Sequence, residues 1–348
     1  MQKVEPLCPQ FGVCGGCLYQ DRPYAEELRL KEEKVKTLFE PLDLNKEVFE
    51  PIVASPLEYH YRHKLDLTFI KIKTGETALG FMPQKMFHVL PIEECVIARK
   101  EISDFLPQLK ERVREKLPPK YRTANIVTKT DDSGRIVWGG AGKRTLKMAE
   151  ADYLSTVIGG RRVYYALDTF FQANLSILPL VIEKVLELAG LDARTTFLDL
   201  YGGVGLFGIF AAPHAKQVIL IEDNPASAKC AAFNFKSNGF SNVQIVPARV
   251  EKALERLSEP PAGEKFVALV DPPRNGLAES AVLALAVSAH LERLLYLSCG
   301  PESLARDLRI FADHGWKIAR VTPFDFFPKT RHIETLVLLT HPVRGTIS

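Results

Sequence analysis

The sequence predicts an α/β protein in which a domain with a mostly parallel sheet follows a smaller, strand-rich domain. From about residue 175 onward, nearly continuous apolar runs alternate with helical stretches, a pattern typical of parallel strands covered on both faces. Residues 45–168 instead show short alternating segments separated by turn residues. Three closely spaced cysteines and one amphipathic stretch occupy residues 1–44. We therefore expect three units, at 1–44, 45–168 and 169–348.

The composition is that of an ordinary globular chain. Its 348 residues suffice for two domains with a large core, and 46% of them are hydrophobic. No apolar run is long enough to cross a bilayer, so we expect no membrane association. The first six residues lack the apolar core of a secretory signal, so we expect a cytoplasmic protein with reduced thiols. The formal charge of +3 does not by itself indicate a nucleic-acid partner, and we expect a monomer without a protein partner.

The individual elements follow from the periodicity of apolar residues. Residues 23–40 have helical spacing, with Leu28, Val35 and Leu38 as the expected inner positions. In the smaller domain we expect strands over 64–70 and 124–128 and a helix near 99–117. In the larger domain we expect strands over 196–200, 218–222, 243–246, 266–271, 294–298 and 334–339, with helices between most of them.

Four cysteines have the distribution of metal ligands. Cys8, Cys14 and Cys17 form a Cys-x5-Cys-x2-Cys pattern, and Cys95 follows after a long gap. Soft thiolates favour an iron–sulfur cluster or zinc. In a reducing compartment this spacing indicates metal ligation rather than disulfides.

A glycine-rich loop follows the first strand of the larger domain. The segment Asp199–Gly205 contains three glycines, which permit a tight turn and close approach to a ligand. The loop lies at the carboxyl end of a parallel strand, where α/β sheets bind ligands, and Glu222 at the end of the next strand suits a ribose diol. The dinucleotide pattern G-x-G-x-x-G is absent, so S-adenosylmethionine fits better than a dinucleotide. A tight strand–helix turn without a ligand is the alternative.

Two further strands end at the same edge in residues whose side chains could take part in binding or catalysis. Asp271 precedes two prolines, which stop the strand and fix Asp271 and Arg274 at this edge. Cys299 follows the fifth strand and precedes a helix, whose dipole favours a thiolate. Glu334 enters the last strand, where partial burial would raise its pKa and suit a general base. The alternatives are a solvated Asp271, a buried apolar Cys299 and a surface Glu334.

Taken together, these segments resemble the RNA 5-methyluridine methyltransferases over nearly the whole chain. The resemblance implies a Rossmann-like class I methyltransferase domain, with a smaller strand-rich domain and an N-terminal iron–sulfur segment. It rests on the four cysteines, Tyr59-x-Tyr61-Arg62-x-Lys64, Phe170-Phe171-Gln172-x-Asn174, Asp199-Leu200-Tyr201-x-Gly203-Val204-Gly205, Asp271-Pro272-Pro273-Arg274, Ser298-Cys299 and Phe327-Pro328-x-Thr330-x-His332-x-Glu334.

The resemblance implies a role for each matching residue. Cys299 would be the nucleophile and Glu334 the base in methylation of carbon 5 of uridine. Thiolate addition at carbon 6 would activate carbon 5, and the base would then remove its proton. A 4Fe–4S cluster would be held by Cys8, Cys14, Cys17 and Cys95. S-adenosylmethionine would be contacted by Gln172, Tyr201, Leu206, Glu222 and Asp271, and the RNA by Phe170, Arg62, Lys64 and Arg274, with Phe170 packing against a flipped base.

Some positions depart from the family pattern. Gly202 stands where many relatives carry Cys, Gly300 where Asn or Asp is usual, and Leu206 where a polar residue is frequent. The chain also begins almost at the cysteines, without the small N-terminal β-barrel of many members, which points towards those acting on 23S ribosomal RNA. The T-loop uridine of transfer RNA and a non-catalytic RNA-binding role are the alternatives. The cysteines could hold zinc instead, and a cluster could staple the N-terminal segment or touch RNA.

Overall fold

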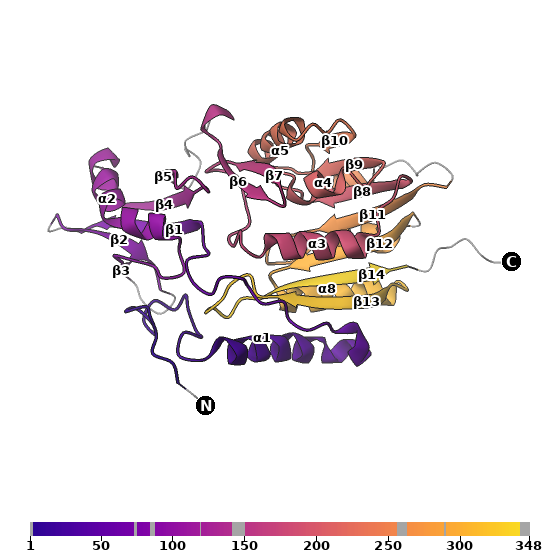
Figure 1. Ribbon diagram of the computed structural model, residues 1–348, viewed down its shortest axis with the longest axis horizontal. Helices are drawn as coiled ribbons and strands as arrows, with labels where there is room; N and C mark the ends of the chain where they lie inside the picture. Colours follow the sequence, from indigo (N-terminus) through magenta and orange to yellow (C-terminus); the bar gives the residue numbers. More distant parts are fainter. Residues whose placement is uncertain are drawn as a thin grey trace.

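Two sheets of different construction lie next to one another in the computed structural model (Figure 1). The structure describes residues 3–72, 75–83, 88–118, 120–140, 150–255, 263–288 and 290–341. None of the helices within these ranges is long and apolar enough to cross a membrane.

The larger sheet has seven strands, in the order β10-β9-β8-β11-β12-β14-β13. The first five are parallel to one another, whereas β14 runs antiparallel to both β12 and β13. The predicted, mostly parallel sheet and its six predicted strands are therefore confirmed. The strands are β8 (Thr195–Leu200), β9 (Gln217–Ile221), β10 (Val243–Val246), β11 (Lys265–Val270), β12 (Leu291–Ser298), β13 (Lys317–Phe324) and β14 (Glu334–Thr340).

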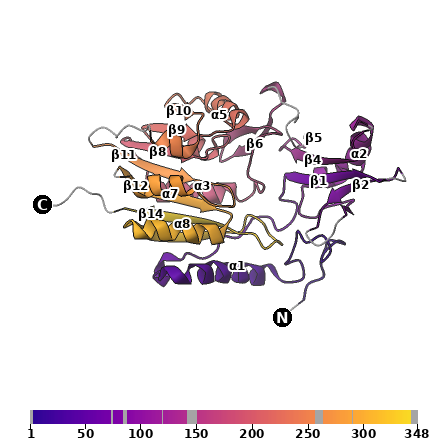
Figure 2. The same ribbon diagram turned by 180° about the vertical axis from the view of Figure 1, so that it is seen from behind.

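Helices cover both faces of this sheet because its strands present apolar residues alternately to two cores. Phe197 belongs to the core shared with α3, α4 and α5, and its neighbour Leu198 to the core shared with α1, α6, α7 and α8. The two layers are visible in opposite views (Figures 1 and 2). The helices are α3 (Leu178–Ala189), α4 (Leu206–Ala211), α5 (Pro225–Ser237), α6 (Val250–Leu254), α7 (Glu279–Ala286) and α8 (Pro301–Asp313).

The smaller domain is an antiparallel sheet with one helix packed against it. Its strand order is β3-β2-β1-β4-β5. The helix α2 (Lys100–Lys116), close to its predicted bounds, buries Ile102, Leu106, Leu109 and Val113 against the sheet. A separate hairpin packs its buried residues into the larger domain's core. The strands are β1 (Lys64–Lys71), β2 (Thr77–Phe81), β3 (Leu90–Pro91), β4 (Thr123–Thr130) and β5 (Ile136–Gly140), and the hairpin is β6 (Leu154–Ile158) with β7 (Arg161–Tyr165).

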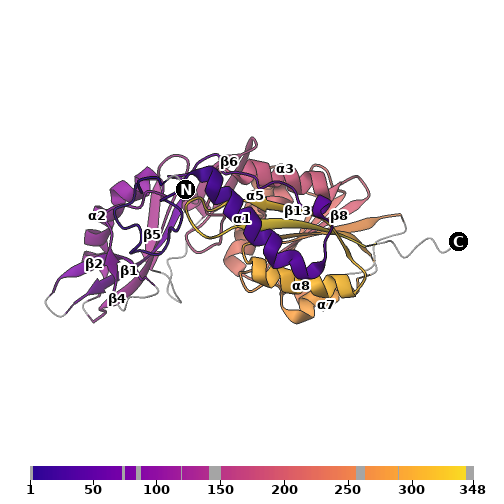
Figure 3. The same cartoon turned by 90° about the horizontal axis from the view of Figure 1, so that it is seen from below.

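The N-terminal helix α1 (Tyr24–Phe39) lies beside α8, near the β13 edge of the larger sheet (Figure 3). Val35 is buried as predicted, but Leu28 and Leu38 are only partly buried. The charged Glu27 and Lys31 occupy the buried face instead. They can do so because the Lys31 ammonium group pairs with Glu27 and with Asp325, each at 2.7 Å. Three short 3-10 helices complete the fold, at Glu40–Leu42, Lys46–Val48 and Glu150–Asp152.

Candidate active site

The predicted site residues meet where β8, β9, β11 and β12 end and β14 begins. Parallel strands place their carboxyl ends at one edge of a sheet. The antiparallel β14 starts at this same edge, because Thr335 pairs with Ser298. Glu334 and Cys299 are thus brought together from opposite strand directions.

The glycine-rich loop forms a bend above β8 that engages Glu222. Tyr201 has a left-handed backbone, with a φ of 59°. One carboxylate oxygen of Glu222 accepts a hydrogen bond from the Gly203 amide at 2.9 Å, and the other from the Asn224 amide at 2.7 Å. A Cβ at Gly202 would lie 2.6 Å from the Leu220 side chain, so Leu220 takes the space that a larger residue at this position would need.

A cavity of about 260 Å³ opens beside this loop. Tyr201 and Glu222 line it, together with Val250 at the start of α6 and Pro273 after β11. Leu206 does not line this cavity: it begins α4 and is buried in the core. The cavity therefore has an aromatic ring and a carboxylate at its edge, which suits a nucleoside.

Two carboxyl groups lie next to the loop, of which Asp199 is fully buried and Asp271 keeps some exposure. Gln172 donates a hydrogen bond to Asp271 at 2.8 Å, and burial raises the pKa of Asp271 to about 7. Burial raises the pKa of Asp199 to about 8, although the Gly208 amide donates a hydrogen bond to it at 2.9 Å. The charges of Asp271 and Glu222 add to this rise, so the carboxyl groups lie within electrostatic reach of each other. Sequence reasoning gave Asp199 no role of its own, although an acid inside a buried apolar strand was a visible signal.

Cys299 and Glu334 perturb each other's surroundings. Burial raises the pKa of Cys299 to about 12, and the nearby Glu334 and Asp271 add to the rise, whereas Arg274 opposes it. Burial thus outweighs the expected effect of the α8 N-terminus. Burial also raises the pKa of Glu334 well above its ordinary value, as predicted, with Asp271 contributing and Arg274 opposing.

Gly300 leaves room for the backbone of Arg274 to approach the residue after the thiol. A Cβ at this position would lie 2.4 Å from the Arg274 carbonyl oxygen. Ser303 at the start of α8 donates a hydrogen bond to the same carbonyl at 2.9 Å. A residue larger than glycine at position 300 would therefore collide with this backbone unless one of the two segments moved.

The loop that leads into Glu334 is fixed by buried charges. Besides its two ion pairs, Lys31 donates a hydrogen bond to the Phe327 carbonyl at 3.1 Å. Glu27 accepts a hydrogen bond from the Lys329 amide at 2.6 Å. The Lys329 carbonyl accepts hydrogen bonds from the amides of Leu18 and Tyr19, at 2.7 and 3.0 Å, which ties the N-terminal segment to the loop. Sequence reasoning missed this network, because charges in an amphipathic helix usually face solvent.

The four cysteines that were predicted to ligate a metal line one cavity of about 680 Å³. Cys8, Cys14 and Cys17 face Cys95 across it, and the cavity extends to Arg274. Within the described ranges, however, no three His, Cys, Asp or Glu side chains are placed to hold a metal ion. The structure thus brings the predicted ligands to one cavity without forming a closed coordination site.

Of the predicted RNA-contacting residues, Lys64 begins β1 of the smaller sheet, Arg62 precedes it, and Arg274 follows β11 of the larger sheet. Arg62 donates a hydrogen bond to the Lys64 carbonyl at 3.0 Å, and Lys64 pairs with Asp66 at 3.1 Å. Phe170 is 66% exposed, which is unusual for an aromatic side chain beside a buried core. The turn that precedes Phe170 is held by the buried Lys129 of β4. The Lys129 ammonium group donates hydrogen bonds to the carbonyls of Ala166, at 2.7 Å, and Thr169, at 2.6 Å.

Comparison with known proteins identifies the family. The tRNA (uracil-5-)-methyltransferase family matches residues 135–342. Relatives named as uncharacterized RNA methyltransferases, from Caldanaerobacter subterraneus and Thermotoga maritima, are each 30% identical over 97% of this chain and 85% of their own length. The crystal structure of the Pyrococcus abyssi tRNA (uracil-54, C5)-methyltransferase in complex with S-adenosyl-L-homocysteine has a TM-score of 0.70 and 21% identity, covering 92% of this chain and 84% of that one, and shows the shared fold. The chain therefore belongs to the tRNA (uracil-5-)-methyltransferase family and is an RNA methyltransferase.

Proposed function

We propose that this protein methylates carbon 5 of a uridine in structured RNA, with S-adenosylmethionine as the methyl donor. The observation that carries the proposal is the meeting of Cys299 and Glu334 at the edge of the sheet where the acid-lined cavity opens. A thiol, a base and a donor cavity are the parts that this reaction requires.

The donor site that we propose is formed by Gln172, Tyr201, Glu222 and Asp271. Glu222 would contact the ribose, and Tyr201 would pack against the adenine. The carboxyl groups would favour the positive sulfonium, which supplies an electrophilic methyl group. The Pyrococcus abyssi protein, which has the same fold, was crystallised with the demethylated form of this donor. Leu206 would support the loop by packing in α4 rather than by direct contact.

The chain's own residues would carry the remaining steps. Phe170 would stack on the flipped uracil, and Arg62, Lys64 and Arg274 would contact the RNA. Cys299 must lose its proton before it adds to carbon 6, and Arg274, which lowers the pKa of the thiol, would stabilise the thiolate. After methyl transfer, Glu334 would take the proton from carbon 5. Elimination of the Cys299 thiolate from carbon 6 would then restore the aromatic ring.

We propose that Cys8, Cys14, Cys17 and Cys95 hold a 4Fe–4S cluster. Four thiols around one cavity are the donor set that such clusters use. The cluster would staple the N-terminal segment to the smaller domain, because Cys95 belongs to the latter. Zinc is the second candidate. Iron and sulfide analysis with the visible spectrum separates the two, since zinc is colourless, and Cys14→Ser is expected to lower the melting temperature if the site is a staple.

Methyl transfer from labelled S-adenosylmethionine to unmodified RNA tests the proposed reaction. Label in 5-methyluridine is expected with the wild-type protein and with Cys230→Ala, which removes a thiol outside the site, but not with Cys299→Ala. Sizing of the labelled RNA separates 23S ribosomal RNA from transfer RNA, the substrate named for the Pyrococcus abyssi protein. A labelled product with Cys299→Ala would remove the nucleophile from the mechanism, and the absence of label with the wild type would favour a binding role.

A further inference from the structure

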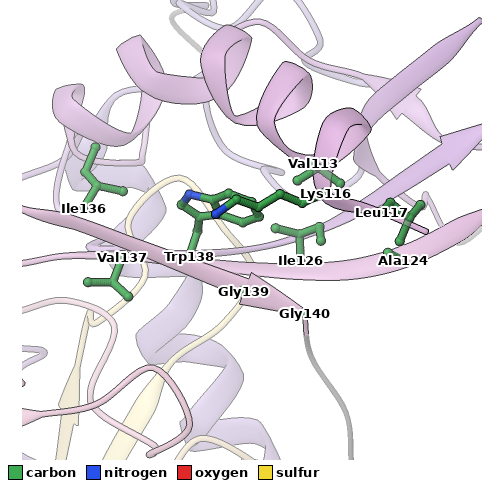
Figure 4. Close-up of a pocket in the computed structure, with 10 residues that line it drawn as sticks. All are labelled: Val113, Lys116, Leu117, Ala124, Ile126, Ile136, Val137, Trp138, Gly139 and Gly140. Carbon is green, nitrogen blue, oxygen red and sulfur yellow. The ribbon is translucent and has the colours of Figure 1, made fainter. Parts of the chain in front are cut away.

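A third cavity, of about 390 Å³, lies in the smaller domain between the C-terminal end of α2 and strands β4 and β5. Trp138 projects from β5 into this space, and the Lys116 side chain from α2 lies along the indole (Figure 4). The Lys116 ammonium nitrogen is 5.2 Å from the centre of the indole ring. The other walls are mostly aliphatic, including Val113, Leu117 and Ile126.

The two tryptophans of the chain differ in how their polar atoms are satisfied. Trp316 is 3% exposed, and its indole nitrogen donates a hydrogen bond to the Ala286 carbonyl at 3.0 Å. Trp138 is partly exposed, and its indole nitrogen donates no hydrogen bond to any part of the chain that the structure describes. A partly exposed indole is typical of a surface where one side of the ring is apolar and the other can meet a polar partner.

The segment that supplies Lys116 to this cavity is rich in basic residues. Residues 110–122 carry six basic side chains and two acidic ones, a balance of +4, whereas the whole chain carries only +3. The rest of the chain therefore sums to −1. A strongly basic segment next to an aromatic cavity complements a polyanion that also carries planar rings. The basic residues are Lys110, Arg112, Arg114, Lys116, Lys120 and Arg122, and the acidic ones are Glu111 and Glu115.

Strand β4 lies between the cavity and the turn that presents Phe170. Ile126 lines the cavity on one face of the strand, and Lys129, three residues later and therefore on the other face, holds the Thr169 carbonyl next to Phe170. RNA that contacted both sites would pass around the edge of the smaller sheet. Among the described residues, β5 is the strand at that edge.

We propose that this cavity binds an unpaired nucleobase of the RNA substrate, stacked on Trp138, while Lys116 and the adjacent basic residues contact the flanking phosphates. The inference rests on RNA being the substrate, but not on which RNA is methylated or on the proposed catalytic residues. The cavity would hold the substrate at a second point outside the catalytic site.

Tryptophan fluorescence tests the stacking directly, because RNA that stacks on Trp138 quenches an indole that solvent can reach. The probes are a single-stranded oligoadenylate and an abasic oligomer of the same length, which retains the phosphates but has no bases. Saturable quenching is expected with the oligoadenylate and not with the abasic oligomer. In Trp138→Phe the remaining emission, from the buried Trp316, is expected not to respond.

Affinity measurements complete the test. Trp138→Ala is expected to weaken oligoadenylate binding about 5- to 150-fold, the range that corresponds to loss of one base–aromatic stack, whereas Trp138→Phe keeps most of the affinity. The charge variant Lys116→Gln is expected to weaken binding. Its matched control is Lys317→Gln, which removes an exposed lysine at the end of the larger sheet away from Glu334 and is expected to have no effect.

Three results would overturn the proposal. Equal quenching by the abasic oligomer would leave only electrostatic contact near the cavity. Trp138 emission that changes with protein concentration in the absence of RNA would assign the cavity to a second copy of the chain. Equal oligoadenylate affinities of Trp138→Ala and Trp138→Phe, even if the wild-type fluorescence is quenched, would show that no base stacks on residue 138. None of these readouts requires methyl transfer, so failure here is distinguishable from failure of the proposed reaction.

Discussion

The substitution Lys31→Met tests whether the buried ion network stabilises the loop before Glu334. Lys31 is 1% exposed, and both of its partners, Glu27 and Asp325, are fully buried. Removal of the ammonium group leaves Asp325 without an ion-pair partner in the interior, and Glu27 with only the Lys329 ammonium, at 3.7 Å. Breaking a buried pair in this way costs about 3–5 kcal/mol, or roughly 4–7 °C in melting temperature for a chain of this size.

The pH dependence of this loss has a defined sign. Burial already raises the pKa of Glu27 to about 7 and that of Asp325 above its ordinary value, while Lys31 opposes both rises. Without Lys31 both pKa values rise further, so the folded variant binds more protons than the folded wild type. The deficit in stability is therefore expected to be larger at pH 8 than at pH 6.

Urea unfolding of the two proteins at both pH values measures the deficit. The control is Lys36→Met, which breaks an exposed pair with Glu32 on the same helix and is expected to change stability by at most about 0.5 kcal/mol. The reasoning is refuted if Lys31→Met destabilises no more than Lys36→Met, or if its deficit does not depend on pH.

Three further predictions concern the catalytic site. Glu334→Gln is expected to accumulate a covalent RNA–protein adduct on denaturing gels, because the Cys299 thiolate can add to carbon 6 but the proton on carbon 5 cannot be removed. The adduct should be absent from the double variant Cys299→Ala/Glu334→Gln. A Glu334→Gln enzyme with full turnover would exclude the carboxylate as the base. The KM for S-adenosylmethionine is expected to fall as pH rises from 6 to 8, because Asp271, whose pKa burial raises to about 7, is uncharged below that value and negative above it; Asp271→Asn should flatten this profile, and an unchanged profile would contradict the assignment. Gly300→Ala is expected to lower kcat by about 10- to 100-fold with a loss of about 1–3 kcal/mol in stability, because its Cβ would meet the Arg274 carbonyl at 2.4 Å; unchanged kcat and melting temperature would show that the backbone relaxes freely.

The larger domain was predictable because its central strands carry an unmixed signal. The run Phe266–Val270 is buried along its length and has no competing interpretation. Strand β13 was missed because Lys317–Phe324 mixes charged and apolar residues and contains a proline, as edge strands can. Its place at the edge of the sheet is fixed by β14, which the local sequence does not reveal.

The site was partly predictable because motif residues follow strands that end at one edge. Cys299 could be placed by that rule. Glu334 could not, because it begins a strand whose antiparallel direction the local sequence does not reveal, and neither could Leu206, because its burial depends on how α4 packs. The buried position of Lys31 depends on Asp325, a partner 294 residues away. Contacts of that kind leave no local pattern, so sequence reasoning placed Val35 correctly but missed Glu27 and Lys31 on the buried face.

The separation of Lys31 from Asp325 has a consequence for the growing chain on the ribosome. At about 5–20 residues per second, synthesis of the 294 intervening residues takes roughly 15–60 s. During that interval α1 can form, but its charged face has no partner, and the segment Leu18–Tyr19 lacks the Lys329 carbonyl that orders it. The loop before Glu334 therefore cannot assemble on the growing chain until β13, the turn beyond it and the start of β14 have been synthesised.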